Sequence, residues 1–254
     1  MSVITILCML VIVLSITVFM VWASASIRSG VYVRAFCGEK TDRKVVYLTF
    51  DDGPHPPETE RVLDVLRERG ARATFFLIGS KVSGNEAVLH RMLEEGHALG
   101  LHTYSHAGTF PLLSFDKMLA DVNEGKRAVE SVAGKKISLF RPPFGVTNPT
   151  IAKVVRTLGL QTVGWDVRSF DTMFCKSSEY SCKQSGHDWY VPVVERIMKQ
   201  VRPGSVILLH DRLDGASSLL ALLLDSLAAS GYDFTRALPN TLTSSSDSSE
   251  TNLS

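Results

Sequence analysis

The sequence lacks an excess of charge of either sign, since 27 lysines and arginines stand against 26 aspartates and glutamates. A chain of net charge +1 has no long-range attraction for phosphate backbones. No basic stripe with interleaved aromatic residues appears, so a nucleic-acid partner is excluded. Internal repeats are absent as well. The length of 254 residues and the 45% share of hydrophobic residues suit one large core or two small ones.

Cysteine is scarce, and the four cysteines do not show whether the chain lies in a reducing or an oxidising compartment. Cys175 and Cys182 flank a polar stretch and would close a small disulfide loop in an oxidising compartment. Their spacing is not that of a zinc-binding CxxC pair, so it gives little support for a metal site there. The other two are Cys8 and Cys37.

Charged residues are missing from the N-terminal segment between Val3 and Ala25. Its roughly 23 residues exceed the about 20 that a helix needs to span a bilayer, and Trp22 stands where an interfacial aromatic would. A cleaved signal peptide is the alternative, because residues 23–25 resemble a small-residue cleavage site. However, the basic n-region is missing and the apolar stretch is longer than usual. We expect a retained transmembrane anchor at 1–26, followed by a juxtamembrane linker at 27–43.

Apolar runs alternate with helical patterns from residue 44 to residue 238. Strands are expected at 45–50, 73–78, 98–101, 137–140, 161–165, 205–209 and 232–235. Helices are expected at 57–69, 86–95, 114–132, 148–158, 190–201 and 217–230. This alternation predicts a parallel sheet with crossover helices. Without a glycine-rich nucleotide fingerprint, seven such strands favour an irregular (β/α) barrel over an open doubly wound sheet. Residues 239–254 have the composition of a disordered tail.

Unusual polar residues fall where the expected strands end. These residues are Asp51, Asp52, His102, His106, Arg141, Asp166, His210 and Asp211. In barrels of this kind, reactive groups lie at the carboxyl ends of the strands. The pattern therefore predicts one site at one rim of the sheet.

Two short motifs indicate a metal site with a separate base. Successive side chains of a strand point to opposite faces, so one of Asp51 and Asp52 can hold a metal while the other stays free. An Asp-Gly turn is the plainer interpretation of that pair. His102 and His106 are four residues apart, and one helical turn would bring both imidazoles to the same side. Two imidazoles and one carboxylate are typical of a catalytic zinc site with an open position.

Arg141 and His210 complete the candidate site. Prolines stiffen the loop after Arg141, and Asn148 is placed to cap the helix that Pro149 begins. Arg141 has no role in that cap, but its guanidinium suits the orientation of a catalytic carboxylate. His210 ends a buried strand, and its reference pKa near 6.5 suits a general acid opposite a metal.

Four segments together resemble motifs of the NodB-homology polysaccharide deacetylases, carbohydrate esterase family 4. These segments are Thr49–Pro54, His102–His106, Arg141–Gly145 and Leu208–His210, in the family's order. The resemblance spans about residues 44–236, the deacetylase domain being expected at 44–238. It implies a distorted (β/α) barrel that holds one divalent metal ion, usually Zn²⁺.

The resemblance also implies roles for individual residues. Asp52, His102 and His106 would bind the metal, with Asp51 as base and His210 as acid. Arg141 would orient Asp51. For the substrate and the oxyanion, the implied residues are Leu208, Pro143 and Phe144, the last through its backbone N–H. The implied reaction is hydrolysis of N-acetyl groups on the amino sugars of peptidoglycan or a chitin-like glycan.

Departures from the family pattern leave one role open. Arg168 replaces an acid and Thr172 a tryptophan in the fourth motif, so either Asp166 or Asp171 is expected to orient His210. Phe144 replaces a tyrosine, which is harmless if only its backbone acts. Leu101 stands where asparagine is common, and 173–189 looks like an insertion. The remaining histidines, His55, His90, His97 and His187, are interpreted as structural or solvent-exposed.

Two other functions fit the same residues. The first is a deacylase or deformylase of a lipid-linked sugar, which the anchor favours. The second is a non-catalytic carbohydrate-binding envelope protein on the same fold, which the altered fourth motif favours. The sequence does not indicate an oligomeric state.

The side of the membrane stays open. Only the amino terminus precedes the span, whereas Arg28, Arg34, Lys40, Arg43 and Lys44 follow it, so the positive-inside rule places the domain in the cytoplasm. Polymeric acetylated sugars lie on the opposite face. The expected substrate therefore favours an extracytoplasmic domain.

Overall fold

The computed structural model describes residues 2–174, 189–240 and 242. The expected bridge between Cys175 and Cys182, the position of His187 and most of the tail at 239–254 lie outside these residues.

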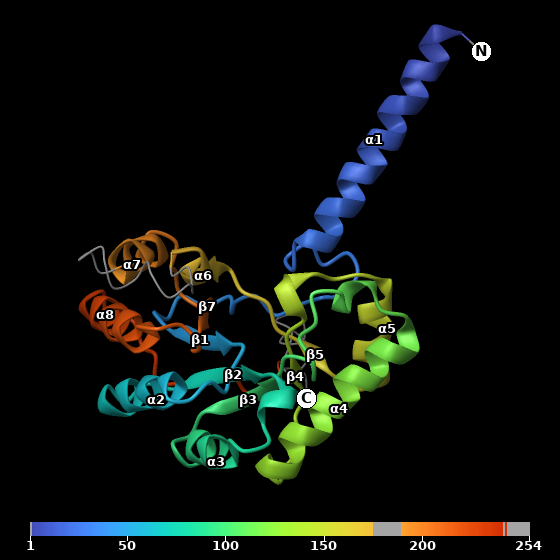
Figure 1. Cartoon of the computed structure of the whole chain (residues 1–254). Helices are drawn as coiled ribbons and strands as arrows, with labels where there is room; N and C mark the ends of the chain where they lie inside the picture. The colour runs from blue at the N-terminus through green and yellow to red at the C-terminus, as the bar shows by residue number, and fades with distance from the viewer. Residues whose placement is uncertain (1, 175–188, 241, 243–254) are drawn as a thin grey trace, which may run out of the picture.

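A curled, parallel seven-stranded sheet forms the centre of the molecule, in the order β5-β4-β3-β2-β1-β7-β6 (Figure 1). The strands are β1 (Val46–Asp51), β2 (Ala73–Leu77), β3 (Ala98–Leu101), β4 (Leu139–Phe140), β5 (Gln161–Thr162), β6 (Val167–Arg168) and β7 (Ser205–His210). Strands β1 and β2 are buried along their whole length, as their mostly apolar sequences require. The curled parallel sheet with crossover helices confirms the predicted α/β fold.

Helices pack their apolar sides on the sheet. The long helices of the domain are α2 (Glu58–Glu68), α3 (Glu86–Glu94), α4 (Phe115–Ala133), α5 (Pro149–Thr157), α7 (Tyr190–Met198) and α8 (Ala216–Ala229). The short ones are η1 (Gly79–Lys81), η2 (Phe110–Leu112), η3 (Pro143–Gly145) and α6 (Asp171–Phe174). Asn148 accepts a hydrogen bond from the Ile151 N–H at 2.8 Å and Pro149 begins α5, so the predicted cap is confirmed.

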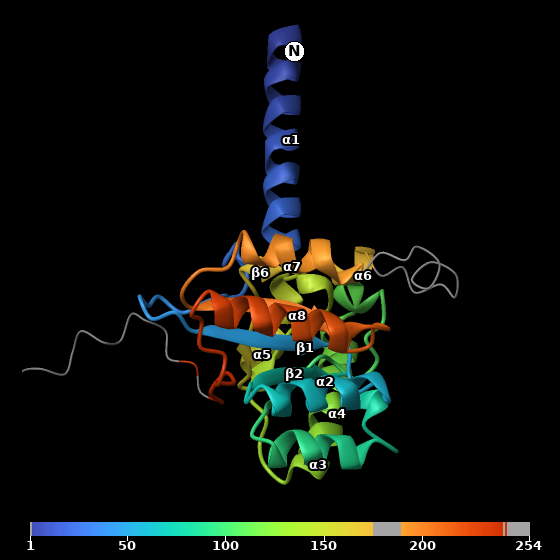
Figure 2. The same ribbon diagram turned by 90° about the vertical axis from the view of Figure 1, so that its left-hand side faces the viewer.

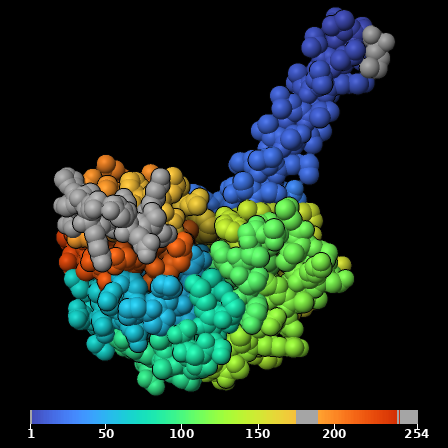
Figure 3. Space-filling model, in the orientation of Figure 1, coloured from blue at the N-terminus to red at the C-terminus, as the bar shows by residue number. Residues whose placement is uncertain are grey.

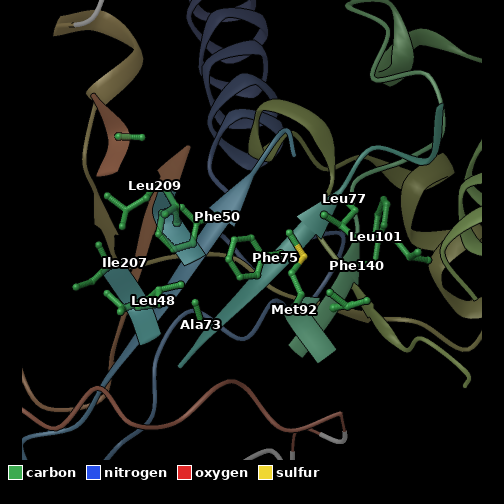
Figure 4. Packing of buried hydrophobic residues seen from close by; sticks show 14 of the residues in the cluster. Leu48, Phe50, Ala73, Phe75, Leu77, Met92, Leu101, Phe140, Ile207 and Leu209 are labelled. Carbon is green, nitrogen blue, oxygen red and sulfur yellow. The ribbon is translucent and has the colours of Figure 1, made fainter. Parts of the chain in front are cut away.

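The core lies between the sheet and these helices (Figure 4). Phe50 of β1 stacks on Phe75 of β2 with ring centroids 5.1 Å apart, and Met92 of α3 is fully buried behind them. Each such side chain stabilises the fold by roughly 1.5–3 kcal/mol through its burial. This packing fixes the strand ends that carry the polar residues.

Two strand expectations differ from the structure. The stretch 232–235 contributes only an isolated bridge, between Asp233 and Val45. Strand β6 was not expected, because its two residues carry no apolar run, yet it pairs with β7. Pairing with an existing edge strand, rather than local sequence, makes β6 a strand.

The segment expected as a linker contacts the chain directly after β5 and the first residue of β7. Phe36 forms a parallel bridge to Val163 beside β5, while Gly38 bridges Ser205 of β7. The Glu39 N–H donates to the Gly204 carbonyl at 2.8 Å, and Gly204 has a φ of 81°. Residues 36–39 therefore lie across the gap that would otherwise separate β5 from β7.

Helix α1 (Val3–Ala25) extends away from the domain (Figures 1 and 2). The space-filling view shows it as a rod that leaves the body at one point (Figure 3). It is long and apolar enough to cross a membrane, a test that a signal sequence near the N-terminus also passes. Only its last turn touches the domain, where Ala23 is fully buried.

Candidate active site

The carboxyl ends of β1 and β7 place two reactive groups side by side. Asp51, the last residue of β1, is the register partner of His210, the last residue of β7. Register partners on neighbouring strands direct their side chains to the same face of a sheet. The carboxylate and the imidazole therefore share one face at the rim.

Arg141 holds Asp51 in place from below. Its guanidinium is fully buried and donates from Nη1 to Asp51 Oδ1 at 2.7 Å and to Thr49 Oγ1 at 2.9 Å. The other nitrogens donate to the carbonyls of Val163 and Gly164. This set of bonds leaves Arg141 one orientation and places a cation against the buried carboxyl group of Asp51. The expected orienting role of Arg141 agrees with this geometry.

Asp52, His102 and His106 converge beside Asp51. Asp52 Oδ1 lies 3.6 Å from His102 Nε2 and 3.4 Å from His106 Nε2. The three donor atoms lie within 4.8 Å of one another. A tetrahedral zinc site with bonds near 2.1 Å has donors roughly 3.4 Å apart. The donor set and its spacing fit a divalent cation.

The backbone of the histidine pair differs from the expected helical turn. Residues 102–106 form an irregular loop, in which Thr103 has a φ of 68° and His106 a φ of 49°. The rings still lie side by side, with centroids 4.7 Å apart. Residues with left-handed backbone conformation therefore bring the imidazoles together, in place of the single helical turn that was expected within this loop.

Hydrogen bonds hold the two ligand candidates that directly follow β1 and β3. His102 Nδ1 lies 2.7 Å from the Arg141 carbonyl, which directs Nε2 toward Asp52. Asp52 has a φ of 74°, and its carbonyl accepts a bond from Lys81 Nζ at 2.7 Å. Backbone strain of this kind costs about 1–3 kcal/mol and is characteristic of functional sites.

The charges around Asp52 keep it ionised. Burial alone would raise its pKa, but the imidazoles of His102, His210 and His106 and a bond from Arg212 lower the pKa to about 2. Arg212 Nε donates to Asp52 Oδ2 at 2.7 Å, so Oδ1 remains directed at the imidazoles. Burial, followed by the charge of His102, lowers the pKa of His106. Neutral imidazoles and an anionic carboxylate are the forms that bind metals.

Asp171 is the partner of His210, which settles the choice that the sequence left open. Asp171 Oδ1 lies 2.8 Å from His210 Nδ1, and Oδ2 accepts the His210 N–H at 2.9 Å. Burial lowers the pKa of His210, but the charge of Asp171, with smaller contributions from Asp51 and Asp52, raises it to about 9. The imidazole is therefore protonated at neutral pH.

Asp166 does not belong to the rim, contrary to the expectation from its place in the sequence. Its carboxylate accepts bonds from the Val206 N–H at 2.8 Å and from Ser205 Oγ at 3.0 Å. Both partners begin β7, whereas His210 ends it. Asp166 directly precedes β6 and therefore lies at the amino end of that strand. The prediction put it at the carboxyl end of a strand at 161–165, which is the opposite edge of the sheet.

Asp211 lies beneath the rim rather than in the site. Its Oδ2 accepts a bond from Thr59 at 2.7 Å, and a Cβ on Gly53 would lie 2.3 Å from the same oxygen. Complete burial raises the pKa of Asp211 to about 7. The aspartate fills the space that the Asp-Gly turn after β1 leaves.

The loop after β4 forms another wall of the site. Phe144 has a φ of 62°, its side chain is 52% exposed, and its ring lies 5.2 Å from that of His106. Pro143 and Leu208 are buried beside the rim. Gly145 has a φ of 69°, and the Trp165 ring lies 2.5 Å from the position of its missing Cβ.

Sequence reasoning missed two cations of the site. Arg212 and Lys81 both bind Asp52, yet neither belongs to a motif with a known spacing. Arg212 comes two residues after His210, and only the turn after β7 directs it back to β1. No pattern in the sequence could have found either residue.

Comparison with known proteins adds the family. Residues 38–163 match the family model described as polysaccharide deacetylase, a stretch that includes Asp51 and Phe144 but ends before His210. Peptidoglycan-N-acetylglucosamine deacetylase of Bacillus cereus is 36% identical over 200 residues, which make up 76% of this chain and 86% of that protein. Chitooligosaccharide deacetylase of Azorhizobium caulinodans is 32% identical over 171 residues, or 65% of this chain and 73% of that protein.

A solved structure agrees with these sequence matches. The peptidoglycan deacetylase PdaC of Bacillus subtilis superposes with a TM-score of 0.65 at 30% sequence identity. The superposition covers 77% of this chain and 89% of that one. The similarity therefore extends over nearly the whole globular part.

Proposed function

The chain belongs to the polysaccharide deacetylase family, and we propose that it is a metal-dependent hydrolase that removes N-acetyl groups from amino sugars of a glycan. Peptidoglycan and chitin-like glycans are the candidate substrates, by analogy with the relatives. One observation carries the proposal. An arginine-held carboxylate and a protonated imidazole are register partners beside a cluster of two histidines and one aspartate.

Asp52, His102 and His106 would hold the divalent cation, for which we favour Zn²⁺. When bound, such a cation polarises an amide carbonyl and lowers the pKa of water. Asp51 lies beside this cluster, with its Oδ2 3.9 Å from His102 Nε2.

Asp51 is assigned the role of general base. Its Oδ1 is occupied by Arg141, so Oδ2 is the oxygen that takes a proton from the attacking water. Because Arg141 fixes the carboxylate, proton transfer requires no reorientation of the base.

His210 is assigned the role of general acid. Asp171 binds Nδ1, so the proton available to the departing amine is the one on Nε2. The pKa near 9 keeps that proton in place at neutral pH, and the amine product takes it as the C–N bond breaks.

The loop after β4 and strand β7 are assigned to the acetyl group. The backbone N–H of Phe144 would stabilise the oxyanion that forms on the carbonyl carbon. Leu208 and Pro143 are buried apolar side chains at the rim and would contact the acetyl methyl. These assignments follow the family resemblance and the position of the three residues.

The proposal includes the anchor and its orientation. We assign residues 1–26 to a retained membrane helix and residues 44–238 to a catalytic domain on the extracytoplasmic face. Burial of Ala23 against the domain supports retention, because a cleaved segment has no reason to pack there. Protease accessibility in intact cells tests the orientation, since an extracytoplasmic domain is digested without lysis.

Acetate release from peptidoglycan fragments and from N-acetylglucosamine oligomers tests the activity. Asp51→Asn is expected to lower kcat by about 10²–10⁴-fold while the bound zinc stays at wild-type stoichiometry. Asp42→Asn, which changes an exposed aspartate in the same way, is the matched control. An Asp51→Asn protein of wild-type rate would contradict the assigned base. Zinc binding without turnover on any acetylated sugar would instead support a carbohydrate-binding protein.

A further inference from the structure

The end of the membrane helix is bonded directly to the loop that forms a wall of the active site. The Thr147 N–H donates to the Ser24 carbonyl at 2.9 Å, and Thr147 Oγ1 donates to the Ala23 carbonyl at 3.3 Å. Ala23 and Thr147 are both buried. Ile27 continues the contact and packs 3.1 Å from the position of a Cβ on Gly164. The end of helix α1 therefore packs against the domain and is hydrogen-bonded to it, rather than being joined to it only through the chain; we call this contact the seat of α1.

The position of Trp22 gives the depth of this loop in the membrane. Tryptophan near the end of a membrane helix marks the interface between the hydrocarbon core and water. Ser24 is two residues further on, which is roughly 3 Å along the helix axis. The headgroup layer on each side of a bilayer is about 5–8 Å thick. In a membrane spanned by α1, the loop that ends at Thr147 would thus lie within the headgroup layer.

Two large apolar side chains are exposed near this seat. Phe144 precedes Thr147 by three residues, and its ring lies 5.2 Å from that of His106. Leu112 is 85% exposed, and Asn148 Nδ2 holds the neighbouring Pro111 carbonyl at 2.7 Å. Exposed leucine and phenylalanine beside a membrane helix indicate a surface that the membrane covers.

Exposed arginines also lie on the side of the site where α1 meets the domain. Arg168 lies over Phe170 at 4.6 Å and over Trp165 at 5.9 Å, and Trp165 in turn packs against Gly145. Arg28 comes three residues after the last residue of α1. Arginines at this level attract the phosphates of anionic lipids. In contrast, α3 lies at the opposite end of the molecule from α1 (Figures 1 and 2).

We propose that the surface formed by Leu112, Phe144 and Arg168 lies in the headgroup layer of the membrane that holds α1. The preferred substrate is then an N-acetylated amino sugar joined to a lipid of that membrane. This inference rests on the proposed function and refines its substrate. The bonds between Ser24 and Thr147 hold the site at the membrane surface, so a sugar on a lipid reaches it without leaving the bilayer. The effective concentration of such a substrate is higher than that of a free glycan.

Photolabelling tests the surface without requiring turnover. The full-length Asp51→Asn protein is reconstituted in phosphatidylglycerol vesicles that contain a lipid with a photoreactive headgroup. We expect labelled peptides that contain Leu112 and Phe144, and none from α3. Equal labelling of α3, or a mature protein that has lost residues 1–25, would overturn the proposed contact.

Kinetics test the substrate class. Acetate release is compared between N-acetylglucosamine linked through diphosphate to a polyprenol in the same vesicles and soluble N-acetylglucosamine oligomers. We expect kcat/KM to be at least about tenfold higher for the lipid-linked sugar. A higher value for the soluble oligomers would refute the substrate assignment. Absence of turnover on both would refute the proposed function, while photolabelling would still decide the surface contact.

A substitution at Leu112 distinguishes an effect on membrane contact from an effect on the chemical step. Leu112→Glu is expected to lower kcat/KM for the lipid-linked sugar roughly fivefold, equivalent to about 1 kcal/mol, and to leave the soluble oligomers unchanged. Ala87→Glu adds the same charge at an exposed position of α3 and should change neither rate. Leu112→Ser serves if the charged variant is unstable. An equal loss on both substrates would contradict the inference.

Discussion

Replacing Asp171 by asparagine removes the charge that keeps His210 protonated. Asparagine retains the size of aspartate and one oxygen acceptor, so the bond from the His210 N–H at 2.9 Å survives. Without the carboxylate, burial dominates, and we expect the pKa of His210 to fall from about 9 to its reference value near 6.5 or below. The acid is then largely unprotonated above neutral pH.

The size of the effect follows from the two pKa values. At pH 8, a group with a pKa of about 9 is protonated in about 90% of molecules, and one with a pKa of about 6.5 in about 3%. If His210 is the general acid, Asp171→Asn lowers kcat/KM about 30-fold at pH 8. At pH 6 the loss shrinks to less than about twofold, because most of the imidazole is protonated in both proteins.

The pH profile of acetate release is the assay. We expect the basic limb to begin near pH 9 in the wild type and at least two units lower in Asp171→Asn. Asp166→Asn is the matched control, because Asp166 is also buried beside β7 but binds Ser205 and Val206 at the other end of the strand. The Asp166→Asn protein should be less stable, but the basic limb of its pH profile should stay at the wild-type pH. A limb that stays in place in Asp171→Asn would refute the assignment of His210 as an acid set by Asp171.

Three further outcomes test the site and its support. Arg141→Met leaves the buried charge of Asp51 unpaired, so the free energy of unfolding in urea should fall by about 3–5 kcal/mol; a loss below about 1 kcal/mol would contradict the pairing. Asp52→Ala removes one of three donors, so zinc measured by mass spectrometry should fall below stoichiometric amounts, and a chelator should abolish wild-type acetate release. Gly204→Ala places a Cβ 2.0 Å from the Glu39 carbonyl oxygen, whereas Gly70→Ala, also at positive φ, meets nothing within 4 Å. Gly204→Ala should therefore lower the thermal midpoint more, and equal shifts would show that residues 36–39 do not hold the sheet closed.

The family, the parallel fold and most helices could be predicted from the sequence, because each depends on local patterns. Apolar runs such as Val45–Phe50 require burial on both faces, and the cap of Asn148 acts over three residues. The predicted family is confirmed by the comparisons. The candidate metal ligands could also be predicted, because the carboxyl ends of parallel strands meet at one rim whatever the conformation of the connecting loops.

The partner of His210 could not be predicted, because distance along the sequence does not decide it: Asp166 directly follows the expected strand at 161–165, and Asp171 lies a few residues further on. Strand β6 decides between them. Its pairing with β7 places Asp166 at the start of β7 and Asp171 at its end. Local sequence does not make β6 a strand, so this choice exists only in the assembled sheet.

The sequence by itself determined which candidate reactive groups this chain carries: a carboxylate pair, two histidines four apart, an arginine after a strand and a strand-end imidazole. These residue types and spacings suffice because strand direction alone collects them at one rim. The tertiary structure decided what surrounds them. The bond of Arg212 to Asp52, the match of His210 with Asp171 and the seat of α1 on Thr147 join residues 160, 39 and 123 positions apart. No local pattern encodes such contacts, because they arise only when separate elements pack against one another.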